Sequence, residues 1–274
     1  MDQMTGVLDM ELIEKKGRTI ANRAFFKGAL KVMRPFYLED NGHVCYYILN
    51  PGGGYLDGDR YHIRVSLKDQ AQATLTTQSS TKVYKTPKDH AYQVTEVFLK
   101  DKSYLEFLPD PLIAYKDAKY KQKNVFHLDG SSALLYSDIL TPGWSPEGED
   151  FSYDTLQLIN EVYVDEKLLL YDHVKLQPGK QDMNSLGFME GTTHLGSMIV
   201  VGEQTTDELI DKIYESLCPS SDEYRMGISR LAVPGFTIRI LSNNTQIIEQ
   251  AFNKCHRLIR NEWFGNEPAS LRKY

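Results

Sequence analysis

The chain turns sharply at Asn50-Pro-Gly-Gly-Gly-Tyr-Leu-Asp-Gly-Asp59, and the segments on both sides of this stretch are typical of strands. Three successive glycines after a proline mark backbone that bends where a Cβ would clash. Before them, Val44–Leu49 is a near-continuous apolar run. After them, Tyr61–Leu67 alternates apolar and polar residues and has no helical period. The stretch therefore predicts a tight turn between two strands.

The same glycines could be compared with a phosphate-binding loop. Such a loop lies between a strand and the N-terminus of a helix, whose amides hold the anion. Here the turn leads into another strand, and neither Gly-Lys-Ser/Thr nor Gly-x-Gly-x-x-Gly is present. The sequence favours a structural turn over nucleotide binding.

A second unusual run, Thr76-Thr-Gln-Ser-Ser-Thr-Lys-Val-Tyr84, follows soon after. Its small hydroxyl and amide side chains cannot all enter an apolar core without hydrogen-bond partners. Two interpretations remain open. The run either faces water on one side of a sheet, or lines a polar cavity or passage. Lys82 and Tyr84 at its end are compatible with the second interpretation and with contact to a partner.

Most of the remaining chain also predicts short strands, at spacings of roughly 8–12 residues. Turns at Lys100-Asp-Lys102 and at Asp129-Gly130 predict hairpins, and so does the junction of 155–165 with 167–176. No linker rich in Pro, Gly or Ser divides the chain. We expect a mainly β fold in one domain over residues 1–274, with many short strands in a solenoid-like (helical) or layered sheet arrangement.

Two segments toward the C-terminus predict α-helices. Residues 205–217 place apolar side chains on one face, and Thr205 with Glu208 fits a capping box. Residues 244–264 do the same, and Gly265 is a natural C-cap.

Composition limits the function classes. The 274 residues include 41% hydrophobic and 25% charged residues, as in ordinary globular proteins. A net charge of −6 disfavours binding to nucleic acid or to an anionic membrane. The three cysteines, Cys45, Cys218 and Cys255, are too scattered for a disulfide framework. The N-terminus lacks the apolar core of a signal peptide, and no stretch approaches the ~20 apolar residues of a membrane span. We expect a cytoplasmic protein.

No motif for a tight metal site or a catalytic nucleophile is visible. His-Glu-x-x-His, Cys-x-x-Cys and Gly-x-Ser-x-Gly are absent, and Cys218 is at most a soft ligand at a helix end. Carboxylates do lie in loops and at strand ends, and a pair of them could serve acid and base roles in a carbohydrate-active β-solenoid enzyme. These carboxylates are Asp57, Asp59, Glu106, Asp138, Glu149 and Asp150.

The two opening motifs in tandem resemble the signature of the urease accessory protein family called UreD or UreH. Leu108-Pro-Asp-Pro-Leu-Ile-Ala-Tyr115, with Gln122 beyond it, is similar to a proline-bracketed strand of that family. Asp138-Ile139 leading to Gly143 and Gly148-Glu149-x-Phe151 matches another block, and Arg230-Leu231, Arg239 and the final helix resemble its C-terminal region. One departure is Trp144, which stands where the family pattern has an arginine.

The resemblance implies a β-rich scaffold with two helices and no catalytic residues. It implies binding to the urease apoprotein, recruitment of a helical UreF-like partner and, through it, of a UreG-like GTPase that carries nickel. It also implies that nickel passes through an internal tunnel, with no cofactor permanently bound. Weak oxygen ligands suit such a passage, because a closed Cys/His site would retain the ion.

The candidate residues follow from this interpretation. Candidates for partner binding or for lining the tunnel are Asn50, Asp59, Thr77, Gln78, Thr81, Lys82, Tyr84, Asp138 and Glu149. Candidates for transient nickel contacts are Asp57, Asp59 and Glu106. The alternatives are the carbohydrate-active enzyme with paired carboxylates and a plain β-rich adaptor with no metal in transit.

Overall fold

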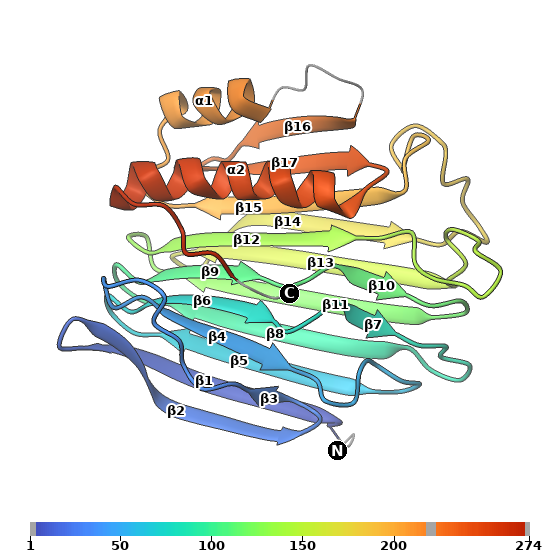
Figure 1. The fold of residues 1–274 in the computed structure, drawn as a ribbon, viewed down its shortest axis with the longest axis horizontal. Helices are drawn as coiled ribbons and strands as arrows, with labels where there is room; N and C mark the ends of the chain where they lie inside the picture. The colour runs from blue at the N-terminus through green and yellow to red at the C-terminus, as the bar shows by residue number, and fades with distance from the viewer. Residues whose placement is uncertain (1–3, 218–222, 272–274) are drawn as a thin grey trace.

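The computed structural model describes residues 4–217 and 223–271, and these residues form two sheets that pack over a common core (Figure 1). Cys218 lies outside the described residues. The seven strands of sheet A lie in the spatial order β14 (Lys167–Leu176), β13 (Thr155–Val164), β11 (Lys119–Leu128), β8 (Ala91–Leu99), β5 (Arg60–Leu67), β1 (Gly6–Lys15), β2 (Arg18–Gly28).

Sheet B has ten strands within the same residues. Its main path runs β16 (Tyr224–Arg230), β17 (Gly235–Ser242), β15 (His194–Val201), β12 (Ala133–Leu140), β9 (Tyr104–Leu108), β6 (Gln72–Thr77), β4 (Val44–Leu49), β3 (Lys31–Val32). Two short strands, β7 (Thr81–Val83) and β10 (Leu112–Ala114), lie beside this path.

The chain winds between the sheets as a solenoid. From β4 onward each coil contributes one strand to sheet B and the next long strand to sheet A, in the pairs β4/β5, β6/β8, β9/β11 and β12/β13. Equivalent strands of successive coils pair in parallel in both sheets. The prediction of a mainly β, solenoid-like arrangement is confirmed.

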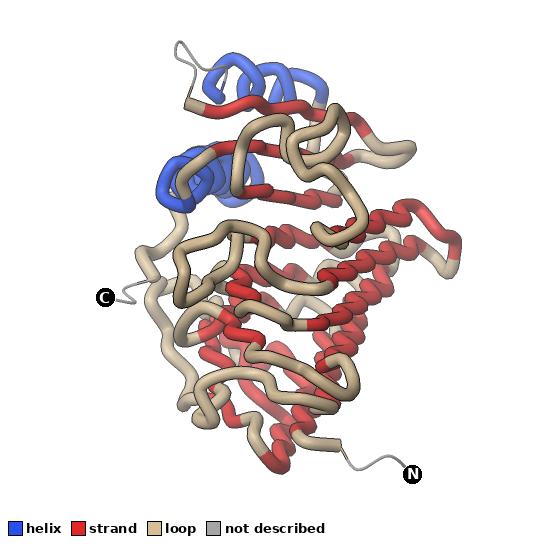
Figure 2. The backbone as a smooth tube through the Cα atoms, turned by 90° about the vertical axis from the view of Figure 1, so that its right-hand side faces the viewer, coloured by secondary structure: helices blue, strands red, loops and turns tan. Residues whose placement is uncertain are grey.

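A narrow third strip connects the sheets on one side of the solenoid. Strands β7 and β10 pair in parallel there, and single bridges extend the strip from Tyr55 to Val83 and from Tyr115 to Trp144. Figure 2 views the molecule from this side, where the loops of successive coils lie one above another.

The glycine-rich turn forms the first rung of this strip. Gly53 has a positive φ of 78°, which strongly favours glycine. A Cβ on Gly54 would lie 2.6 Å from the ring of Tyr84 and 2.7 Å from the carbonyl oxygen of Lys82. This close approach lets the amide of Tyr55 donate to the Lys82 carbonyl at 2.8 Å. The interpretation of the stretch as a structural turn is confirmed, and the turn packs directly on the hydroxyl-rich segment.

Two predicted hairpins are wrong. The turn at Lys100-Asp-Lys102 joins β8 in sheet A to β9 in sheet B, and Asp129-Gly130 joins β11 to β12 in the same way. A short turn permits either geometry, and parallel pairing with the neighbouring coils decides between them. The third hairpin is confirmed, because β13 and β14 pair antiparallel.

The helices α1 (Asp207–Leu217) and α2 (Thr245–Phe264) agree with the predicted segments, and α2 packs against β12, β15 and β17 on the outer face of sheet B (Figure 1). The predicted C-cap of α2 is confirmed, since Gly265 is left-handed, and Asn244, predicted as the first helical residue, is the N-cap. The predicted capping box of α1 is wrong by one residue, since Thr206 Oγ1 accepts from the Leu209 amide at 3.2 Å while Thr205 is buried.

The core has two parts. The larger lies between the sheets and includes Leu8, Val65 and Leu75, and the smaller lies between sheet B and the helices and includes Phe236 and Ile248. Strands such as β12 are buried on both faces, which explains their near-continuous apolar sequence. In the described part of the chain, neither helix has the length and hydrophobicity needed to span a bilayer.

Candidate functional site

The interior of the solenoid becomes polar on the side of the third strip. A cavity of about 90 Å³ lies there between the sheets, and its lining reaches from the exposed Gln78 and Ser79 to buried side chains of β8, β11 and β12. The polar residues of the lining are Asn50, Tyr55, Thr77, Gln78, Ser79, Ser80, Thr81, Lys82, Gln93, Asp110, Gln122, Asn124, Tyr136 and Asp138. Six of the nine residues predicted for partner binding or tunnel lining therefore surround one cavity: Asn50, Thr77, Gln78, Thr81, Lys82 and Asp138.

The wall formed by sheet A carries a ladder of polar side chains. Parallel register places Thr95, Asn124 and Asn160 opposite one another on β8, β11 and β13. The Asn124 amide nitrogen donates to Asn160 Oδ1 at 2.9 Å and to the Tyr136 hydroxyl at 2.9 Å. Asn160 in turn donates to Asp172 Oδ2 at 3.2 Å. Strands β8, β11 and β13 thus each place a polar side chain at this position, whereas β5 places Ile63 opposite Thr95.

The wall formed by sheet B contributes Asp138. The Tyr136 hydroxyl donates to Asp138 Oδ2 at 2.8 Å, within the buried interior. Burial raises the pKa of Asp138 from 3.8 to about 6, although Tyr136 and Arg239 act in the opposite direction. Arg239 also pairs with Asp172 on sheet A. This carboxyl can therefore change its charge near neutral pH inside the solenoid.

One buried acceptor in the ladder is unused. Asn124 is 1% exposed, and its Oδ1 has no hydrogen-bond partner in the described part of the chain. A buried amide oxygen without a partner costs free energy, so it normally contacts water or an ion. Asn124 lines the cavity beside Tyr136, so its free amide oxygen would stabilise a water molecule, an ion or another polar group in the cavity.

The hydroxyl-rich run divides between two environments. Thr77 exchanges hydrogen bonds with Asp110 at the rim of the cavity, where Thr77 Oγ1 lies 2.8 Å from Asp110 Oδ2. Thr74 and Thr76 point to the outer face of sheet B and are buried there, with Glu106 and the Leu108 carbonyl as partners. The interpretation of the run as cavity lining therefore holds for residues 77–82 and not for Thr76, Val83 or Tyr84.

Asp59 lies next to the cavity and is fully engaged. Its carboxylate accepts from the Leu56 amide at 2.7 Å, the Thr5 hydroxyl at 2.9 Å and the Tyr61 hydroxyl at 3.0 Å. The same Tyr61 hydroxyl lies 3.5 Å from the amide nitrogen of Asn50. Asp59 therefore holds the glycine-rich turn to the start of β5.

The remaining candidates lie on the surface. The Tyr84 ring packs on Tyr115 with centroids 4.8 Å apart, and Trp144 continues this stack at 4.9 Å from Tyr115. Glu149 is exposed on a loop, 4.0 Å from Lys116. Asp57 accepts from the amides of residues 88 and 89 and so fixes a turn. Asp59 and Glu149 do not line the cavity, and of the six carboxylates considered for acid and base roles Asp138 is the one in its lining.

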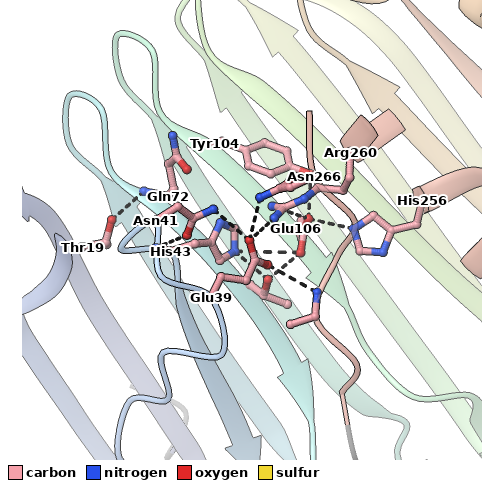
Figure 3. Close-up of polar contacts among 12 residues, drawn as sticks. Thr19, Glu39, Asn41, His43, Gln72, Tyr104, Glu106, His256, Arg260 and Asn266 are labelled. Carbon is pink, nitrogen blue, oxygen red and sulfur yellow. Dashed lines mark hydrogen bonds and ion pairs between the residues drawn. The ribbon is translucent and has the colours of Figure 1, made fainter. Parts of the chain in front are cut away.

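Glu106 belongs to a separate buried cluster beneath α2 (Figure 3). It accepts from the Thr74 hydroxyl at 2.5 Å and lies 2.7 Å from His256 and 3.3 Å from Arg260. Burial alone would raise the pKa of Glu106, but the contacts with His256, His43 and Arg260 outweigh it and hold that pKa well below its usual range. Arg260 also pairs with Glu39, which ties α2 to the segment before β4. The cluster contacts a second cavity of about 340 Å³ and is apart from the interior one.

Sequence reasoning missed Asn124 and Asn160, the central rungs of the ladder. A signal was present, because both occupy positions where the two-residue period of their strands places apolar residues such as Phe126 and Leu158. Amides at buried strand positions indicate a polar interior. In the part of the chain that the structure describes, no three His, Cys, Asp or Glu side chains converge in a way that could hold a metal ion.

Comparisons with known proteins identify the family. The family model described as UreD urease accessory protein matches residues 4–273. The chain is 45% identical over 274 residues to the urease accessory protein UreD of Lachnoclostridium phytofermentans, and the match covers 100% of both chains. It is 44% identical to the proteins of the same name from Staphylococcus epidermidis, with 98% of each chain covered, and from Staphylococcus aureus, with 99% of each covered. The chain therefore belongs to the UreD urease accessory protein family.

Proposed function

We propose that this chain is a scaffold for urease maturation through which nickel passes as cargo. It binds the urease apoprotein in the cytoplasm and recruits a UreF-like helical partner and, through it, a UreG-like GTPase. GTP-dependent nickel insertion into the urease active site follows in this assembly. The chain itself catalyses no reaction and holds no permanent cofactor. Its relatives are named urease accessory proteins, which supports a role in maturation.

The observation that carries the nickel path is the polar ladder inside the solenoid. Apolar side chains would fill the space between two sheets at a lower cost than amides and a carboxyl group, because buried polar groups must be paired. Asn124 instead leaves an amide oxygen free beside the Tyr136–Asp138 pair. Amide, hydroxyl and carboxylate oxygens are weak ligands for Ni²⁺ compared with thiolate and imidazole. Such a lining lets an ion enter and leave.

Asp138 adds a charge that depends on its surroundings. Its pKa of about 6 leaves it mostly ionised at pH 7.5, yet close to the point of neutralisation. A passing cation stabilises the ionised form, and protonation after its departure removes the attraction. In this proposal Asp138 draws the ion inward and does not retain it.

A blocking substitution at the cavity rim tests the path. Gln78→Trp places an indole at the exposed end of the lining without disturbing the core, and Lys88→Trp is the matched control on a nearby exposed turn. We expect Gln78→Trp to lower the nickel content of co-expressed urease several-fold while the urease complex still co-purifies. Normal nickel content with Gln78→Trp, and also with Asn124→Leu, would rule out the interior path.

Deletion tests the role in maturation separately. Removing the chain from cells that express the urease subunits and the other accessory proteins should leave urease without nickel. Fully loaded and active urease in the deletion strain would refute the scaffold role, whatever the result for the cavity variants.

A further inference from the structure

The two ends of the solenoid differ in whether helices cover the strands there. At the C-terminal end, β14 and β16 are the edges of the two sheets, and α1 and α2 cover the outer face of sheet B with an apolar core between them. At the N-terminal end, β2 is the edge of sheet A and β3 is the edge of sheet B, and Figure 1 shows no further element beyond them. Solenoid proteins usually need a capping unit with a polar outer face at each end. The N-terminal end of the described chain lacks such a cap.

The charge of this end is opposite to that of the whole molecule. Residues 15–38 contain seven basic residues and no acidic one. All 37 acidic residues and the other 24 of the 31 basic residues lie outside this segment, where the net charge is −13. Within the described residues only Arg23 of the seven has an acidic partner, Asp9 at 2.9 Å. Six positive charges are therefore left without a counter-charge.

Large apolar side chains are exposed between these charges. Phe25 is 51% exposed and Leu38 is 47% exposed, and the others of the group are Phe26, Met33, Phe36 and Tyr37. The cations and rings interleave: Lys31 Nζ lies 5.0 Å from the centre of the Phe26 ring, and the Arg18 guanidinium lies 5.4 Å from that of Tyr37. We call residues 15–38 the basic aromatic face. Several exposed large apolar side chains within one short segment are typical of an interaction site.

The backbone of β2 offers a docking edge. The first residues of β2 are already engaged on their outer side, since the Thr19 amide donates to the Gly42 carbonyl and the Tyr37 hydroxyl donates to the Thr19 carbonyl. From residue 22 to residue 28, β2 pairs only with β1 among the described strands. An unpaired strand edge of this length readily accepts another strand.

We propose that the basic aromatic face docks an extended, acidic segment of a partner protein, which adds to residues 22–28 as a further strand of sheet A. The inference rests on the proposed function, because it takes the partner to be one of the proteins of urease maturation. A second copy of this chain is disfavoured as the partner, because its six unpaired positive charges would lie against the six of the first copy. A nucleic acid or an anionic membrane would be repelled by the net charge of −13 on the rest of the molecule.

Charge reversal tests the surface. Lys27→Glu with Arg34→Glu removes two exposed cations that have no ion-pair partner in the described residues, and Lys167→Glu with Lys175→Glu makes the same change in charge on β14, the opposite edge of sheet A. Each purified variant is titrated with urease apoprotein, with the UreF-like protein and with the UreG-like protein in 0.1 M salt. We expect the first variant to weaken the Kd for one of them more than about tenfold and the second to change it little. The difference should shrink in 0.5 M salt.

Hydrogen exchange on the wild-type complex tests strand addition without any substitution. The amides of residues 22–28 that point away from β1 should exchange at least tenfold more slowly in the complex than in the free chain. Unchanged exchange there, or an equal loss of affinity in both charge variants, would overturn the proposal. The proposal would also be overturned if neither charge variant altered the affinity for any of the three proteins. This outcome would count against the docking surface even if deletion of the chain still abolished urease maturation. The wild-type chain is also tested for binding to DNA and to phosphatidylglycerol vesicles. If Lys27→Glu with Arg34→Glu abolished such binding and changed the affinity for none of the three proteins, the basic aromatic face would bind another ligand and the proposal would be wrong.

Discussion

Replacing Asp138 with asparagine should stabilise the fold at neutral pH and impair nickel delivery. The carboxyl group is buried between the sheets and accepts a hydrogen bond from Tyr136 at 2.8 Å. Asparagine has nearly the same shape and keeps an oxygen that can accept this bond. What the substitution removes is the charge, which is costly in this environment and which the proposed passage of a cation requires.

The size of the effect follows from the pKa of Asp138. The unfolded chain has the ordinary value of 3.8, and the folded chain has about 6, so the folded state holds the proton more tightly. The contribution of this group to stability is therefore full below about pH 4 and is lost as the pH rises through about 6. Linkage gives a loss of about 1.6 kcal/mol at pH 5.0 and about 3 kcal/mol at pH 7.5.

Urea unfolding of both proteins at the two pH values measures this loss. The free energy of unfolding of Asp138→Asn should exceed that of wild type by a margin that grows by about 1.4 kcal/mol between pH 5.0 and pH 7.5. Asp69→Asn, at an exposed turn, is the control and should show no such growth. A margin independent of pH would refute the assignment of a raised pKa. Full nickel loading of urease with Asp138→Asn would refute its role in the passage.

Three further predictions concern the scaffold. Gly54→Ala should lower Tm by several degrees and reduce complex formation, because the added Cβ would lie 2.6 Å from the Tyr84 ring; an unchanged Tm would show that the turn relaxes freely. Glu106→Leu should cost roughly 3 kcal/mol in urea unfolding, since the buried Arg260 loses its one fully buried carboxylate partner and keeps the partly exposed Glu39, and a cost below 1 kcal/mol would contradict this account. Trp144→Ala should cost less than about 1 kcal/mol, because this side chain is 49% exposed at the end of its aromatic stack, and a larger loss by the same assay would indicate a core role.

The features predicted correctly from the sequence depend on residues close together in the chain. The period-2 pattern of Tyr61–Leu67 and the C-cap of α2 at Gly265 are properties of one segment each. The β13–β14 hairpin is similar, because its strands are joined by a short turn and pair with each other. In all these cases the partner of each backbone group lies within a few residues, so local chemistry decides the outcome.

The incorrect hairpins show where local chemistry is insufficient. The turn at Asp129-Gly130 suits a hairpin as well as a corner between two sheets. The corner prevails because β11 pairs in parallel with β8 and β13, which lie in the preceding and following coils. These pairings bury apolar surface between the sheets, and no short motif encodes them.

The sequence by itself determined the strand-rich class, the two helices, the family resemblance and the tight turn at Asn50–Asp59, because each depends on local pattern or on short motifs. Only the tertiary structure decided which side chains share a site. It gathered Asn50, residues 77–82 of the hydroxyl-rich run and Asp138 around one cavity, and it placed Glu106 in another cluster with His256, 150 residues away in the chain. The physical reason is that the solenoid stacks residues from successive coils, so that hydrogen bonds such as that between Asn124 and Asn160 join positions 36 residues apart.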